Sequence, residues 1–108
     1  MKELKISELP YKDGKFIFDE PLIVGIQELH PELDHRYELF CVFFEDYEYA
    51  DTLSELMNDL AETVAMNWFG YAEEADENLD ENALKLKNKL KSTMRYELKK
   101  EAENARNN

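Results

Sequence analysis

The sequence predicts an α+β fold, in which an antiparallel sheet of about three strands within residues 4–49 is followed by two helices packed on one face of that sheet. Apolar residues alternate with a period of two in the first half of the chain and recur every three or four residues in the second half. The helices are expected near residues 52–72 and 80–100. No linker or internal repeat interrupts the pattern, so residues 1–108 are expected to form a single domain.

Short strands are expected in the first third of the chain. Residues 4–9 are typical of an edge strand that ends at Pro10. Residues 16–18 and 22–26 follow as further strand segments, and Pro21 is expected to break or bend the chain between them. The polar residues before position 37 then indicate a loop.

The strongest strand pattern covers residues 37–49. Apolar side chains fall on both faces of the middle of this segment, with Tyr37, Leu39, Cys41 and Phe43 on one face and Phe40, Val42 and Phe44 on the other. A strand that is apolar on both faces is typical of the centre of a sheet that is covered on both sides.

Both helices carry start signals. Thr52 with Glu55 matches a capping box, and the apolar residues that follow have helical spacing: Leu53, Leu56, Met57, Leu60, Val64, Trp68 and Tyr71. Asp80 is a good N-cap for the second helix. Its expected buried stripe consists of Ala83, Leu86, Leu90 and Met94.

Charge is divided unevenly along the chain. Residues 1–36 hold five Lys/Arg and eight Asp/Glu, residues 37–82 hold fourteen Asp/Glu and no Lys/Arg, and residues 83–108 hold eight Lys/Arg and three Glu. The three net charges, −3, −14 and +5, account for the overall −12. An acidic body with a basic C-terminal helix favours a basic protein partner and argues against direct nucleic-acid binding or an anionic membrane surface.

The candidate partner-binding residues come from this acidic region and its aromatic end. Trp68 and Tyr71 fit the buried stripe of the first helix, whereas Phe69 falls outside it and is the better interface residue. The predicted contact residues are Asp46, Glu48, Asp51, Glu55, Asp59, Glu62, Phe69, Glu73 and Glu74.

Cysteine use and hydropathy indicate a cytoplasmic protein. Cys41 is the only cysteine, so an internal disulfide is excluded, and we expect it to be a small buried apolar residue. The N-terminus leads into no apolar signal segment, and the longest apolar run, residues 39–44, is far too short to span a membrane.

No pattern in the sequence indicates catalysis, and neither a metal nor another cofactor is expected. Cys41 lies in the middle of a strand, and the three serines have no nucleophile-elbow context. Glu28, His30, Glu32, Asp34 and His35 could converge on a divalent ion, but their spacing matches no defined zinc pattern and is better read as a polar loop.

The segment Asp46-Tyr47-Glu48-Tyr49-Ala50-Asp51-Thr52-Leu53-Ser54-Glu55-Leu56 resembles the strand-to-helix junction of the HicB-like antitoxin family. In that family a strand ends in a small residue and an acidic-Thr-Leu step that opens an amphipathic helix, after a β-β-β-α core. The resemblance implies a toxin-neutralising or related protein-binding role, and it carries over no catalytic residue.

Three functional hypotheses follow. The first is a small prokaryotic protein-binding module, antitoxin-like in fold, whose acidic surface engages a basic partner. The second is an inhibitor, encoded by a mobile element, whose carboxylates imitate nucleic-acid phosphates in a host nuclease. The third is a metal-dependent enzyme that uses His30 and His35. A homodimer through the early edge strand or Phe69 is a further expectation.

Overall fold

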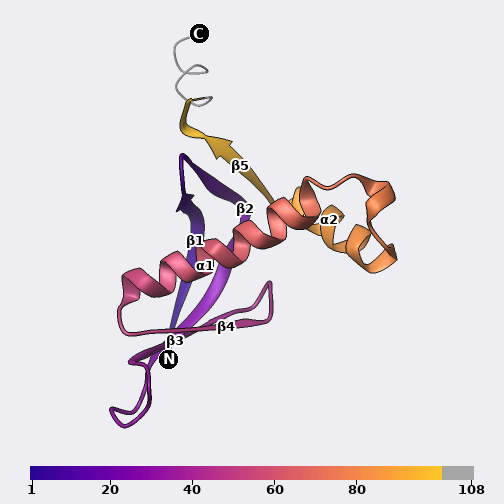
Figure 1. Cartoon of the computed structure of the whole chain (residues 1–108). Coiled ribbons are helices and arrows are strands. Elements are labelled where there is room, and N and C mark those ends of the chain that lie inside the picture. The colour runs from indigo at the N-terminus through magenta and orange to yellow at the C-terminus, as the bar shows by residue number, and fades with distance from the viewer. Residues whose placement is uncertain (101–108) are drawn as a thin grey trace.

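The computed structural model of the protein describes residues 1–100 and confirms the α+β class (Figure 1). The elements occur in the order β1 (Lys2–Tyr11), β2 (Gly14–Glu28), β3 (Tyr37–Cys41), β4 (Asp46–Ala50), α1 (Leu53–Asn67), η1 (Trp68–Ala72), η2 (Asp76–Asn78), α2 (Glu81–Thr93) and β5 (Met94–Leu98). The sheet is antiparallel and has five strands in this part of the chain, rather than the predicted three. The last eight residues of the predicted domain lie outside the described residues.

β2 is the central strand, and it corrects the prediction of two separate strands around Pro21. Its partner β1 places the single residue Ser7 opposite residues 18–21, between the pairs Ile6–Leu22 and Glu8–Ile17. Pro21 lies in this bulge, where no ladder hydrogen bond is required of it, so the strand bends without ending. β1 likewise continues through Pro10, because an edge strand tolerates proline.

The other edge of β2 is shared by two strands. β5 pairs with its first part, from Gly14 to Phe18, and β3 pairs with its second part, from Val24 to Glu28. Gly14 is required at the first junction because a Cβ there would lie 2.8 Å from the ring of Tyr96 and against the backbone of β5. The bend in β2 thus lets one strand bind two neighbours end to end.

The segment 37–49 is a hairpin, so the prediction of one long strand was wrong. β3 ends at Cys41, the chain turns through residues 42–45, and β4 returns beside β3 with Cys41 opposite Asp46. Glu45 takes the left-handed conformation that closes the turn, with φ of 50°. The Val42 N–H donates to the carbonyl of Ile23, which holds the turn beside β2.

Helix α1 crosses one face of the sheet and forms the core with it (Figure 1). Leu56, Leu60 and Val64 of α1 are fully buried against sheet residues such as Leu39 and Cys41. Burial of one such side chain contributes about 1.5–3 kcal/mol. No other element of residues 1–100 covers the opposite face of the β3–β4 hairpin, where Tyr47 and Tyr49 are exposed, which corrects the expectation of a strand buried on both sides.

The first helix starts as predicted and ends in a wider turn. The Thr52 hydroxyl accepts the Glu55 N–H at 3.1 Å, which confirms the cap. After Asn67 the chain becomes π-helical in η1, where the Glu73 N–H donates to the Trp68 carbonyl at 3.2 Å. Trp68 is buried as expected, but the change of helical phase turns Tyr71 outward, contrary to the prediction.

The second helix is shorter than predicted, because α2 ends at Thr93 and residues 94–98 form β5. The Thr93 hydroxyl donates to the Lys89 carbonyl at 2.7 Å in the last turn of α2. Leu90 is fully buried, and Met94 is buried too, but as a strand residue opposite Phe18. α2 lies beside η1 and the β5 side of the sheet (Figure 1).

Candidate functional site

The predicted contact residues lie along two different flanks of α1. Glu62 points towards β1, where it accepts the Tyr11 hydroxyl at 3.3 Å. The next residue, Thr63, points towards β4, where its hydroxyl lies within hydrogen-bonding distance of both carboxylates of that strand. The nine predicted residues therefore do not form one surface: Asp46, Glu48 and Asp59 gather at β4, and Phe69 and Glu73 gather at the other end of α1.

Asp46 and Glu48 lie on the side of β4 that faces α1. The hydroxyl of Thr63 lies 3.4 Å from Asp46 and makes a short hydrogen bond to Glu48. Partial burial is the main cause that raises the pKa of Glu48 to about 7, and the neighbouring carboxylates of Asp46 and Asp59 raise it further. We define Asp46, Glu48 and Asp59 as the carboxylate cluster.

Among the described residues, the carboxylate cluster has no compensating cation. Within residues 1–100, no lysine, arginine or histidine lies within 4 Å of these three carboxylates. Several basic side chains bind acids elsewhere, such as Lys87 to Asp76 at 2.7 Å. The cluster thus concentrates negative charge at a partly buried place where an opposite charge would be favourable.

The other side of β4 is aromatic. Tyr47 packs on Phe40 with a centroid distance of 4.7 Å, and Tyr47 and Tyr49 are nearly parallel at 6.5 Å. The ring of His35 stacks beyond Tyr49 at 6.4 Å. We call these four residues the aromatic row; sequence reasoning missed it, although the alternation Asp-Tyr-Glu-Tyr from residue 46 is the pattern of a strand with two different faces.

Asp51 and Glu55 mainly support the local structure. Asp51 accepts the Arg36 N–H at 3.3 Å and lies 3.7 Å from the His35 imidazole, so it fastens the loop before β3 to the end of β4. Glu55 lies in the first turn of α1, where a negative charge interacts favourably with the helix dipole and stabilises the helix. Asp51 and Glu55 are therefore not part of the carboxylate cluster.

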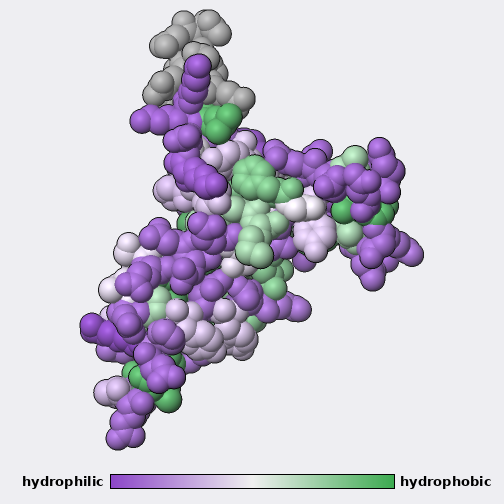
Figure 2. Space-filling model, in the orientation of Figure 1, coloured by the Kyte–Doolittle hydropathy of each residue, from purple (hydrophilic) through white to green (hydrophobic). Residues whose placement is uncertain are grey.

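Phe69, Glu73 and Glu74 lie at the far end of α1. Phe69 packs against Tyr96 at 5.5 Å yet stays 43% exposed. Figure 2 shows an apolar patch over the C-terminal half of α1. Met66 near the end of α1 and Phe69 in η1 are exposed apolar side chains. The Asn78 side chain, which donates to Glu74, is the main cause that lowers the pKa of Glu74.

The loop that contains the two histidines is held by local contacts. The Glu32 N–H donates to Nδ1 of His30 at 3.3 Å, and His35 contacts Asp51. A hollow of about 320 Å³ lies beside them. Among residues 1–100, no three His, Cys, Asp or Glu side chains are arranged to hold a metal ion.

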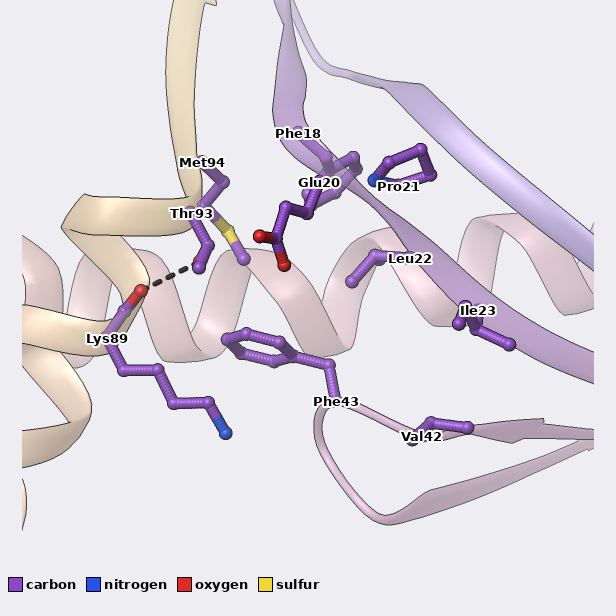
Figure 3. A pocket seen from close by; sticks show the side chains of 10 residues that line it. All are labelled: Phe18, Glu20, Pro21, Leu22, Ile23, Val42, Phe43, Lys89, Thr93 and Met94. Atoms are coloured by element: carbon purple, nitrogen blue, oxygen red, sulfur yellow. Dashed lines mark hydrogen bonds between the residues drawn. The ribbon is translucent and has the colours of Figure 1, made fainter.

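An apolar groove of about 310 Å³ lies where β2 passes between β5 and β3 (Figure 3). Phe43 reaches it from the hairpin turn, and Nζ of Lys89 lies 4.5 Å from the centroid of the Phe43 ring. Glu20 is the acidic residue in its wall. The cation–π contact ties α2 to the turn between β3 and β4.

No protein-family model matches this chain, and no curated protein or solved structure gives a significant match. Among the described residues, no helix has both the length and the apolar character needed to cross a membrane.

Proposed function

We propose that the protein is a small protein-binding module that engages a basic partner protein through the carboxylate cluster of β4 and α1. The supporting observation is the gathering of Asp46, Glu48 and Asp59 with no cation among the described residues. The raised pKa of Glu48 means that its ionised form is disfavoured in the free protein. A lysine or arginine from a partner would relieve this cost, so binding and ionisation favour each other.

The antitoxin-like role belongs to the same proposal. A protein that neutralises a small basic toxin needs a surface of opposite charge and no catalytic group of its own. The fourteen acids without a basic residue in 37–82 provide that charge, and steering by such a field raises association rates.

The test compares two variants with the same change in net charge. The first carries Asp46→Asn, Glu48→Gln and Asp59→Asn, which neutralise the carboxylate cluster. The second carries three replacements of exposed glutamates outside it: Glu3→Gln, Glu73→Gln and Glu77→Gln. Each variant is used to capture partners from the lysate of the native host at about 50 and 300 mM salt, because screening weakens exposed charge contacts.

We expect the cluster variant to lose its partner, with an affinity reduced by roughly tenfold or more, while the control stays within about threefold. Equal losses in both variants would mean that only the total charge matters, and unchanged capture by the cluster variant would refute the proposal. A captured nuclease whose binding competes with DNA or RNA would instead support the nucleic-acid-mimic hypothesis. A captured toxin encoded beside this protein would support the antitoxin role.

A further inference from the structure

In the part of the chain that the structure describes, β4 has a free edge. There it pairs with β3 on one side only and is the last strand in the order β1-β2-β3-β4. Within residues 1–100, no backbone hydrogen bond outside the ladder reaches β4. Every second residue of an edge strand directs its N–H and C=O outward, and such an edge is a template for another strand.

The two sides of this edge have opposite chemistry. Asp46 and Glu48 lie on the side covered by α1, and Tyr47 and Tyr49 lie on the uncovered side, where they are 53% and 46% exposed. A strand added beside β4 would present alternate side chains to these two sides. Its sequence would therefore have to alternate between two kinds of residue.

We propose that the partner adds an extended segment to the outer edge of β4, with Lys or Arg facing Asp46 and Glu48 and apolar or aromatic residues facing Tyr47 and Tyr49. This inference rests on the proposed function, which it makes more specific. Main-chain hydrogen bonds would provide affinity, and the alternation would provide specificity. The carboxylate of Asp59 on α1 raises the pKa of Glu48 and would add to the negative charge that attracts the same basic side chains.

Charge argues against a second copy of this chain as the occupant. In a two-fold antiparallel pairing of β4 with full overlap, Glu48 would lie opposite Glu48 of the other copy, with the two Asp46 residues on the same side of the sheet. Like charges opposite each other destabilise a sheet. Among residues 1–100, β1 is also an edge strand, but it offers no such selection because its charged residues, Lys2, Glu3, Lys5 and Glu8, have no excess of either sign.

The test uses synthetic peptides of one composition and the full-length protein. The first peptide alternates four lysines with three valines, and the second has the same residues in two blocks. A third and a fourth repeat the alternating sequence with N-methyl groups on all valines or on all lysines. Because alternate N–H groups point to opposite edges of a strand, only one methylation pattern blocks the edge that would pair with β4.

We expect the alternating peptide to bind and to slow hydrogen exchange of outward amides in Asp46–Ala50. One methylated peptide should bind at least about tenfold more weakly, the loss expected for two or three hydrogen bonds, and the other should keep most of its affinity. The second peptide, which has its lysines and valines in two separate blocks, should also bind weakly.

Equal binding of all four peptides, with no change in exchange of β4, would refute strand addition but leave charge recognition by the carboxylate cluster standing. Binding that is insensitive to Asp46→Asn with Glu48→Gln would refute the proposed function as well. The two failures are therefore distinguishable within one set of titrations.

Discussion

Glu48 offers a direct test of how burial and neighbouring charge act at the carboxylate cluster. Glu48→Gln keeps the shape of the side chain and an oxygen that can accept the Thr63 hydroxyl, but it removes the charge. The new amide can also donate to Asp46, which in the native protein raises the pKa of Glu48. We therefore expect this substitution to stabilise the protein at high pH.

The magnitude follows from linkage between protonation and folding. The pKa of Glu48 is about 7 in the folded protein, against an ordinary value of 4.5. The folded state thus holds a proton that the unfolded state has released, so stability falls as pH rises from 4.5 through 7. The difference between these two pKa values corresponds to at most about 3.4 kcal/mol, and solvent screening of this partly exposed carboxylate reduces that contribution to about 1–2 kcal/mol.

The assay is urea denaturation followed by circular dichroism at pH 4.5 and pH 8. Glu48→Gln should match the native protein within about 0.5 kcal/mol at pH 4.5 and exceed it by about 1–2 kcal/mol at pH 8. The control Glu62→Gln, on the β1 flank of α1, should change stability by less than about 0.5 kcal/mol at both pH values. A Glu48→Gln variant with the same pH slope as the native protein would refute the reasoning.

Three further substitutions test the fold. Thr52→Ala removes the cap of α1 and should cost about 1 kcal/mol by urea denaturation, and an unchanged midpoint would show that the cap is dispensable. Gly14→Ala places a Cβ against β5 and should cost roughly 1–3 kcal/mol while speeding hydrogen exchange in β5; slow exchange there would contradict the steric account. Lys87→Met should speed proteolysis within residues 73–80, because this lysine is 13% exposed and binds that connection, whereas Lys85→Met, 73% exposed, should leave the rate unchanged.

The α1 helix was predictable because local signals agree with the packing. Thr52 supplies the cap, and the spacing of Leu56, Leu60 and Val64 forms the buried face. The end of α1 was harder to predict, because the π-helical turn that exposes Tyr71 depends on how Trp68 fits against the core.

The β3–β4 turn was missed because it contains no glycine, proline or asparagine. Residues 42–45 are apolar except for Glu45, which takes the left-handed conformation without being a usual turn residue. The turn is stabilised from outside, by the Val42 N–H bound to Ile23 and by Lys89 over Phe43. Such tertiary support leaves no trace in a local pattern.

β5 was missed although its sequence carries a signal. Met94, Tyr96 and Leu98 alternate with Arg95 and Glu97, which is a strand pattern, but Leu90 and Met94 also continue the helical stripe of α2. β5 contributes no residue to the carboxylate cluster. The carboxylate cluster itself was partly predictable from composition, whereas the separation of Glu62 from it required the orientation of α1.

The shared edge of β2 has a consequence for how the chain folds. Ile17 pairs with Arg95, so the first half of β2 finds its second neighbour about 80 residues downstream. Closing a loop of that length is entropically costly, and pairings so distant in sequence slow folding. During synthesis on the ribosome, the β1–β2 hairpin would present an open edge and the Phe16 side chain until β5 emerges. That interval is when a chaperone or a wrongly paired strand would compete for this part of the sheet.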